Sequence, residues 1–88
     1  MGFGEVDEPI IVSEYKQLPQ PNMPGQPNRR YDLYRNGQLH SSRWTDGRGR
    51  PYRDRDFNHS GDGHGFGFPH DHWWFGNYRG DAVSSEIS

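Results

Sequence analysis

The stretch RRYDLYRNGQLHSSRW, residues 29–44, decides the fold. Two segments in which the side-chain type alternates flank the pair Asn36-Gly37. An Asn-Gly pair between alternating segments is the strongest short-range hairpin signal, because both turn positions tolerate a positive φ. The sequence therefore predicts two antiparallel strands joined at Asn36-Gly37.

A third strand is expected directly after this hairpin. Residues 45–50 (TDGRGR) provide a second turn with two glycines and an aspartate, and residues 51–57 (PYRDRDF) alternate again. Three strands with one packed face are about the minimum for independent stability. We therefore expect a three-stranded antiparallel meander over residues 29–57.

The segments after the meander carry glycine and then aromatic residues. Half of residues 58–67 (NHSGDGHGFG) are Gly or Ser, so we expect a loop there. Residues 68–78 (FPHDHWWFGNY) are expected to fold back irregularly, so that Trp73, Trp74 and Phe75 cover the meander. The expected fold class is thus a small, loop-rich all-β domain, in which an irregular aromatic and His-rich segment caps a three-stranded antiparallel meander.

The core of such a domain has to be built mainly from aromatic residues. Among Ile, Leu and Val, only Leu33 and Leu39 fall in the middle of the chain, whereas aromatic residues make up 15% of the sequence. That share is high for a disordered chain, which usually has few aromatic residues. We expect Trp44, Tyr52 and Phe57 to lie in the core.

Several classes of protein are excluded by length and composition. A chain of 88 residues is too short for a large enzyme fold, and the absence of Cys excludes a disulfide framework, thiolate zinc sites and thiol catalysis. No stretch approaches the ~20 apolar residues of a membrane helix, and no signal peptide is evident. We expect a soluble protein; its compartment is not indicated.

Domain organisation follows from proline and charge. We expect an acidic arm and a proline-rich strap over residues 1–28, a single small β domain over residues 29–81 and a flexible tail over residues 82–88. Residues 8–15 (EPIIVSEY) are expected either as one short strand or as part of the arm. Four prolines in residues 18–28 (LPQPNMPGQPN) favour an extended strap.

Charge is distributed unevenly along the chain. Residues 1–27 carry four acidic groups and one Lys (−4 + 1 = −3), and residues 28–81 carry nine Arg and seven Asp (9 − 7 = +2). Arginine suits phosphate recognition, but an Asp lies close to nearly every Arg in this sequence. Internal Arg–Asp pairing on the sheet and a phosphate-facing groove both remain open.

The groups that could carry chemistry are concentrated between residues 54 and 72. They are Asp54, Asp56, His59, Asp62, His64, His70, Asp71 and His72. In one interpretation, the histidines are the general acid and base of phosphodiester cleavage, because imidazole titrates near ~6.5 and can serve as either partner. Asp56 would orient His59, three residues later. Arg53 or Arg55 would hold the phosphate.

A second interpretation is a metal site. His70 and His72 are two residues apart, so both imidazoles share one face of an extended backbone. Asp56, His59 or His64 could complete a tetrahedral set for zinc or another divalent ion. A third interpretation is structural, with the histidines hydrogen-bonded in an aromatic cluster and the Asp residues capping turns. The sequence leaves all three open.

Three runs of this sequence resemble a known kind of module. They are residues 30–39 (RYDLYRNGQL), 42–59 (SRWTDGRGRPYRDRDFNH) and 63–72 (GHGFGFPHDH). They resemble small C-terminal modules of bacterial polymorphic or contact-dependent toxins, of RHS-repeat-like proteins and of some phage head proteins. The resemblance implies a hairpin-rich unit with an Asp-x-Asp-x-x-His motif, a closing Pro-His-x-His and a suspected nuclease activity. The matching positions are Asp54, Asp56, His59, His64, His70, His72 and Arg43. This chain begins with its own Met, which leaves room for a free-standing phage or prophage product.

The function that we expect is a nuclease-like module that cleaves RNA or DNA phosphodiesters, with or without metal. The expected catalytic groups are His59, His70, His72, Asp56 and Asp54. The expected phosphate contacts are Arg43, Arg53 and Arg55, and the expected ligands of zinc or another divalent ion are His64, His70 and His72. The alternative is a non-enzymatic, phage or defence-related module that binds another macromolecule and has a His-rich metal or structural site. Nucleic acid is the expected partner; a protein partner and the oligomeric state stay open, and no membrane is expected.

Overall fold

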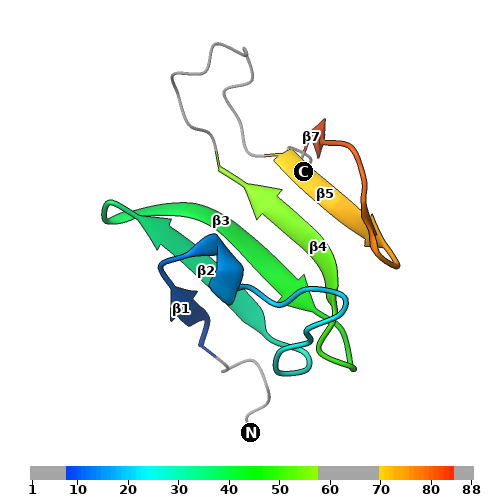
Figure 1. Cartoon of the computed structure of the whole chain (residues 1–88). Coiled ribbons are helices and arrows are strands. Elements are labelled where there is room, and N and C mark those ends of the chain that lie inside the picture. Colours follow the sequence, from blue (N-terminus) through cyan, green and yellow to red (C-terminus); the bar gives the residue numbers. More distant parts are fainter. Residues whose placement is uncertain (1–7, 58–69, 85–88) are drawn as a thin grey trace, which may run out of the picture.

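One sheet of seven strands organises the chain in the computed structural model, which describes residues 8–57 and 70–84 (Figure 1). The elements are β1 (Ile10–Val12), the 3-10 helix η2 (Tyr15–Gln17), β2 (Arg30–Arg35), β3 (Gln38–Thr45), β4 (Pro51–Asp56), β5 (His70–Phe75), β6 (Tyr78–Arg79) and β7 (Val83–Ser84). The strand order is β1-β2-β3-β4-β5-β6, and β7 pairs with β5. Strand β1 runs parallel to β2, and the other pairs are antiparallel.

The predicted meander is confirmed as β2, β3 and β4, and with it the all-β fold class. Asn36 and Gly37 both have a positive φ, of 52° and 77°, as a two-residue hairpin turn requires. The register shifts between Leu33 and Tyr34 and again between Trp44 and Thr45. Such bulges change the direction in which the neighbouring side chains point.

The prediction that an irregular segment caps the meander is wrong. Residues 70–75 form β5, which pairs with β4 in the plane of the sheet. The aromatic residues at the end of β5 have high strand propensity. Gly76, with φ of 65°, then turns the chain into β6. The segment extends the sheet because the outer edge of β4 offers unpaired backbone groups.

The hydrophobic core also differs from the expected one. Its buried members are Val12, Leu18, Tyr31 and Leu33. Two of these four residues precede the meander: Val12 lies in β1 at the edge of the sheet, and Leu18 lies in the segment between β1 and β2, which packs over one face of the sheet (Figure 1). Trp73 and Phe75 are 42% and 65% exposed, so the prediction that they cover the meander is wrong.

The three aromatic residues expected in the core lie nearer to the surface. Trp44 and Phe57 are partly buried, whereas Tyr52 is 39% exposed. The residues between β1 and β2 take the place that these rings were expected to fill. The strap is defined as residues 13–29, a range that includes the proline-rich residues 18–28. The strap face is the face of the sheet that the strap covers.

The side chains of the two sheet faces follow from the cross-strand register, since directly paired residues point to the same side. The strap face carries Tyr31, Leu33, Arg43, Asp54, Asp56, His70, His72, Trp74 and Arg79. The opposite face carries Arg30, Asp32, Ser42, Trp44, Arg53, Arg55, Asp71 and Trp73.

The turn between β3 and β4 makes one contribution to stability dependent on pH. Backbone N–H groups of Arg50 and Arg48 donate to Asp46 Oδ1 at 3.0 and 2.8 Å, and these bonds hold the pKa of Asp46 below its ordinary value. A lowered folded-state pKa adds stability above the unfolded value of about 3.9, and this stability is lost as the pH falls through the folded pKa.

We therefore expect Asp46→Asn to flatten the acid limb of the stability curve. The amide oxygen accepts the same two bonds but does not titrate over this range. Between pH 6 and pH 3, the wild type should lose more unfolding free energy in urea titrations than the variant, by less than about 1 kcal/mol because solvent screens this carboxylate. Equal losses in the two proteins would contradict the assignment.

Candidate metal centre

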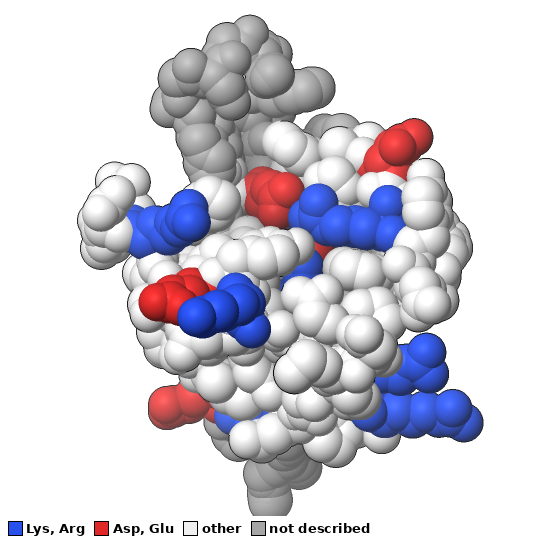
Figure 2. Space-filling view, in the orientation of Figure 1, with Lys and Arg blue, Asp and Glu red and all other residues white. Residues whose placement is uncertain are grey.

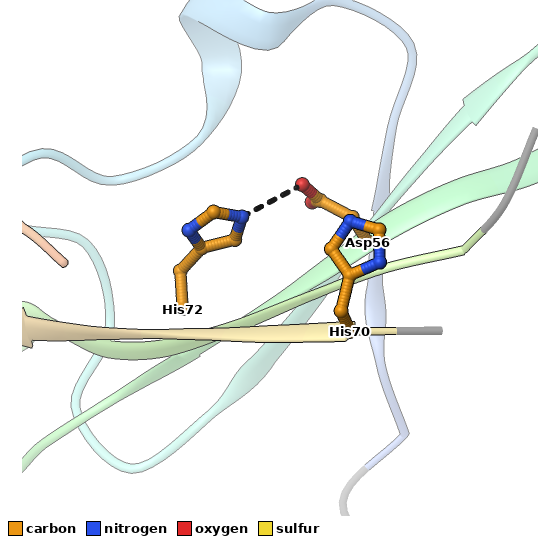
Figure 3. Close-up of side chains that lie close together, drawn as sticks. All are labelled: Asp56, His70 and His72. Atoms are coloured by element: carbon orange, nitrogen blue, oxygen red, sulfur yellow. Dashed lines mark ion pairs between the residues drawn. The ribbon is translucent and has the colours of Figure 1, made fainter. Parts of the chain in front are cut away.

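Three of the predicted site residues converge on the strap face, at the end of β4 and the start of β5. Asp56 pairs with His70, and Asp54 pairs with His72, so Asp56 and both imidazoles point to one side of the sheet (Figure 3). One ligand atom from each of Asp56, His70 and His72 lies within 4.8 Å of the others. These three residues could hold a metal ion, since zinc accepts both imidazole nitrogen and carboxylate oxygen.

The ring of His72 is oriented by the backbone. Its Nδ1 lies 2.8 Å from the carbonyl oxygen of Gly80, and its Nε2 lies 3.4 Å from Asp56 Oδ2. A carbonyl only accepts, so Nδ1 carries a proton, and in the neutral ring the lone pair of Nε2 points toward the cluster. Metal-binding histidines typically have their second nitrogen fixed in this way.

The cluster of Asp56, His70 and His72 is partly buried but still accessible to solvent. The side chains of His72 and Asp56 are 14% and 29% exposed. The rings of His70 and His72 have centroids 5.9 Å apart and planes at 63°, so they do not stack face to face. This geometry leaves ring nitrogens of both residues able to approach a common point (Figure 3).

Asp54, a predicted catalytic residue, lies beside the cluster but is occupied by arginine. It is 2% exposed, and its oxygens accept from Arg43 Nε at 2.8 Å, from Arg43 Nη2 at 2.9 Å and from Arg79 Nε at 2.8 Å. Both oxygens are thus bound to guanidinium groups. The arrangement gives Asp54 the role of an anchor for these arginines.

Arg43, a predicted phosphate contact, is 1% exposed and lies in the interior. Besides Asp54, it donates to the carbonyl oxygen of Pro19 at 2.8 Å and to Tyr15 Oη at 3.1 Å. Burial alone lowers the pKa of its guanidinium, but Asp54 and Tyr15 outweigh that effect and raise the pKa, so Arg43 stays charged. It ties the strap to the sheet and offers little to a phosphate in solvent.

Arg53 and Arg55, the other predicted phosphate contacts, lie on the opposite face of the sheet. Their guanidinium groups pair with Asp71, at 3.1 Å from Arg53 Nη2 and 2.8 Å from Arg55 Nε. Burial by itself raises the pKa of Asp71, but the two arginines outweigh burial and lower the pKa. The sheet therefore separates these arginines from Asp56, His70 and His72.

Arg79 is the guanidinium that the structure places at the cluster, and the sequence interpretation did not identify it. Its Nη2 lies 3.3 Å from each oxygen of Asp56. Arg79 reaches this position because β6 folds back on β5 and pairs it with Trp74. The signal in the sequence was the pair Gly76-Asn77 between two aromatic segments, which is a short hairpin turn.

The remaining predicted histidines, His59 and His64, lie outside the described residues. No family of proteins, no curated protein and no solved structure matches this chain in sequence or fold comparisons. The resemblance to toxin and phage modules therefore stays a prediction. Within the residues that the structure describes, no helix is long and apolar enough to cross a membrane.

Proposed function

We propose that the chain is a metal-dependent, nuclease-like domain in which Asp56, His70 and His72 hold a divalent ion, with zinc the best candidate. The observation that carries the proposal is the convergence of their three ligand atoms within 4.8 Å, together with the fixed ring of His72. Three protein ligands leave one position of a tetrahedral site open, which is the pattern of catalytic zinc sites.

The chemistry that fits such a site is hydrolysis of a phosphodiester. A divalent ion lowers the pKa of a water molecule that it holds and so supplies a nucleophile at neutral pH. The water would lose a proton and its oxygen would form a bond to phosphorus. The bond from phosphorus to the leaving sugar oxygen would break, and that oxygen would take up a proton, so that one water is added across the bond overall. The guanidinium of Arg79 is held beside the cluster by Asp54 and Asp56. It would stabilise the negative charge that develops on the phosphate.

The charges of the chain do not favour a general nucleic-acid coat. Acidic and basic side chains lie next to one another on the face seen in Figure 2. The chain has a net charge of −2, whereas nonspecific binding to nucleic acid depends on positive charge. A substrate would therefore be held mainly at the site itself.

Zinc binding is the first test. We expect the wild type to bind one zinc ion per chain and His72→Ala to bind it at least about 10-fold more weakly, because one of three ligands is lost. Calorimetric titration against a competing chelator measures both affinities. His40→Ala is the matched control, since His40 lies on β3 outside this cluster, and it should bind zinc like the wild type. Equal zinc affinity in the His72 and His40 variants would refute the site.

Cleavage is the second part of the test. Purified protein is incubated with labelled RNA and with labelled DNA, with zinc or with a chelator. We expect cleavage that the chelator and His72→Ala both abolish and that His40→Ala leaves intact. Stoichiometric zinc without cleavage of either polymer would reject the enzymatic proposal and favour a structural metal site in a binding module.

A further inference from the structure

A pocket of about 390 Å³ lies at the other end of the sheet from the metal cluster. Tyr52, near the start of β4, contributes to its lining, whereas Asp56 of the cluster ends the same strand. The pocket is also lined by Arg30 at the start of β2 and by Trp44 near the end of β3. Its volume lies within the range of about 300–1,000 Å³ that is usual for small-ligand sites.

The indole of Trp44, which lines the pocket, is held in place by Arg53 of the neighbouring strand. Trp44 belongs to a cross-strand row in which arginine and tryptophan alternate, in the order Arg30, Trp44, Arg53, Trp73. The guanidinium carbon of Arg53 lies 4.6 Å from the ring centroid of Trp44 and 5.3 Å from that of Trp73. Because Asp71 holds Arg53 on the sheet, the indole of Trp44 has a defined position before any ligand arrives.

The second aromatic group, Tyr52, is placed by the bulge in β3 and β4. Trp44 pairs with Arg53 and Thr45 pairs with Pro51, so Tyr52 has no partner in the register. Its ring lies 6.5 Å from that of Trp73, and the residue is 39% exposed. The phenol ring of Tyr52 is therefore accessible in a pocket that the indole of Trp44 also lines.

Two arginines, Arg29 and Arg30, line the pocket, and none of the described residues that line it carries a carboxylate. The side chain of Arg30 is 44% exposed, and its Nε lies 3.1 Å from Asp32 Oδ1. Asp32 is in turn fixed by Ser42 Oγ at 2.7 Å. The guanidinium of Arg30 is thus oriented by its neighbours while solvent can still reach it.

We propose that this pocket binds a nucleotide, with its base stacked on Trp44 and Tyr52 and its phosphate bonded to Arg30. Stacking of a base on an aromatic side chain is worth about 1–3 kcal/mol and tolerates any base. The planar guanidinium matches phosphate oxygens. A free mononucleotide and one unit of a single-stranded nucleic acid share this chemistry. The proposal does not depend on the metal cluster, because the pocket lies elsewhere on the sheet.

The test uses the whole chain in the presence of a chelator, so that metal plays no part. Adenosine monophosphate, adenosine, inorganic phosphate and a short oligoadenylate are titrated separately, and the indole N–H signals are followed by NMR. We expect the monophosphate to bind at least about 10-fold more tightly than adenosine or phosphate. An oligonucleotide that binds much more tightly than the monophosphate identifies a single strand as the source, and equal affinity identifies the free nucleotide.

Variants inside and outside the pocket test whether the nucleotide binds in the pocket or elsewhere on the surface. Arg30→Gln and Tyr52→Leu should each weaken binding of the monophosphate at least about 5-fold, and both positions are exposed enough for the fold to survive. Arg48→Gln and Phe75→Leu replace an exposed arginine and an exposed ring outside the pocket, and they should bind like the wild type. His72→Ala should also bind like the wild type. The proposal is overturned if the monophosphate binds no more tightly than phosphate, or if Arg30→Gln and Tyr52→Leu bind it unchanged.

Discussion

The substitution Asp54→Ala should lower the free energy of unfolding by about 3–5 kcal/mol, the usual cost of removing one partner of a buried ion pair. Arg43 is 1% exposed, and Asp54 is its carboxylate partner through two bonds of 2.8 and 2.9 Å. Without Asp54, a charge stays buried in the strap face. Small domains are stable by only about 5–15 kcal/mol, so the variant should be close to unfolding at ambient temperature.

Two further variants identify the cause of this loss. Lys16→Ala breaks an exposed ion pair, in which Lys16 lies 3.5 Å from Glu14. The free energy of unfolding should change by no more than about 0.5 kcal/mol. The double variant Arg43→Met/Asp54→Leu removes both charges and should recover most of the loss. Urea unfolding followed by tryptophan fluorescence measures all three. A loss below about 1 kcal/mol for Asp54→Ala would show that the pair does not matter for stability.

A second large effect is expected at the contact between the strap and the turn from β3 to β4. Gly49 has φ of 81°, and a Cβ at this position would overlap the backbone carbonyl of Gly25. The N–H of Gly25 also donates to the carbonyl oxygen of Gly49 at 2.9 Å. We expect Gly49→Ala to cost about 2–4 kcal/mol, because a strained φ and an overlap with rigid backbone add together.

Gly47 in the same turn gives the matched control. A Cβ there meets nothing within 4 Å, and its φ is not in the positive region. Gly47→Ala should therefore be neutral or stabilise by up to about 1 kcal/mol, through the lower entropy of the unfolded chain. Thermal unfolding of the two variants side by side makes the comparison. If the two substitutions cost the same, the overlap with Gly25 is not a constraint on the fold.

Local signals were enough to predict the meander, because each turn there is encoded by its own residues. Asn36-Gly37 has the backbone angles that its chemistry requires, and the alternation in residues 51–57 gave β4. The pairing of β5 with β4 could not be obtained in this way. No turn type fixes the register across a long connection, and only packing in the folded state selects it.

The candidate site was predicted in part. The spacing of His70 and His72 placed both rings on one face of an extended backbone, and Asp56 was among the candidates for the third ligand. The error concerned Arg53 and Arg55, which are close to Asp56 in sequence. In a strand, successive side chains point to opposite faces. Arg55 directly precedes Asp56 and Arg53 lies three residues before it, so both arginines point to the face opposite Asp56. Arg79 was missed for the converse reason, since its proximity depends on a hairpin that we did not identify.

The parallel pairing of β1 with β2 affects the order in which the sheet can assemble. The antiparallel pairs β2–β3 and β3–β4 are joined by short turns, whereas β1 can pair with β2 only after a longer connection closes. If β2, β3 and β4 pair first, Arg43 and Asp54 would meet while both are still hydrated. Contacts with Pro19 and Tyr15 would then exclude water from the guanidinium and the carboxylate together, so neither charge would enter the interior alone.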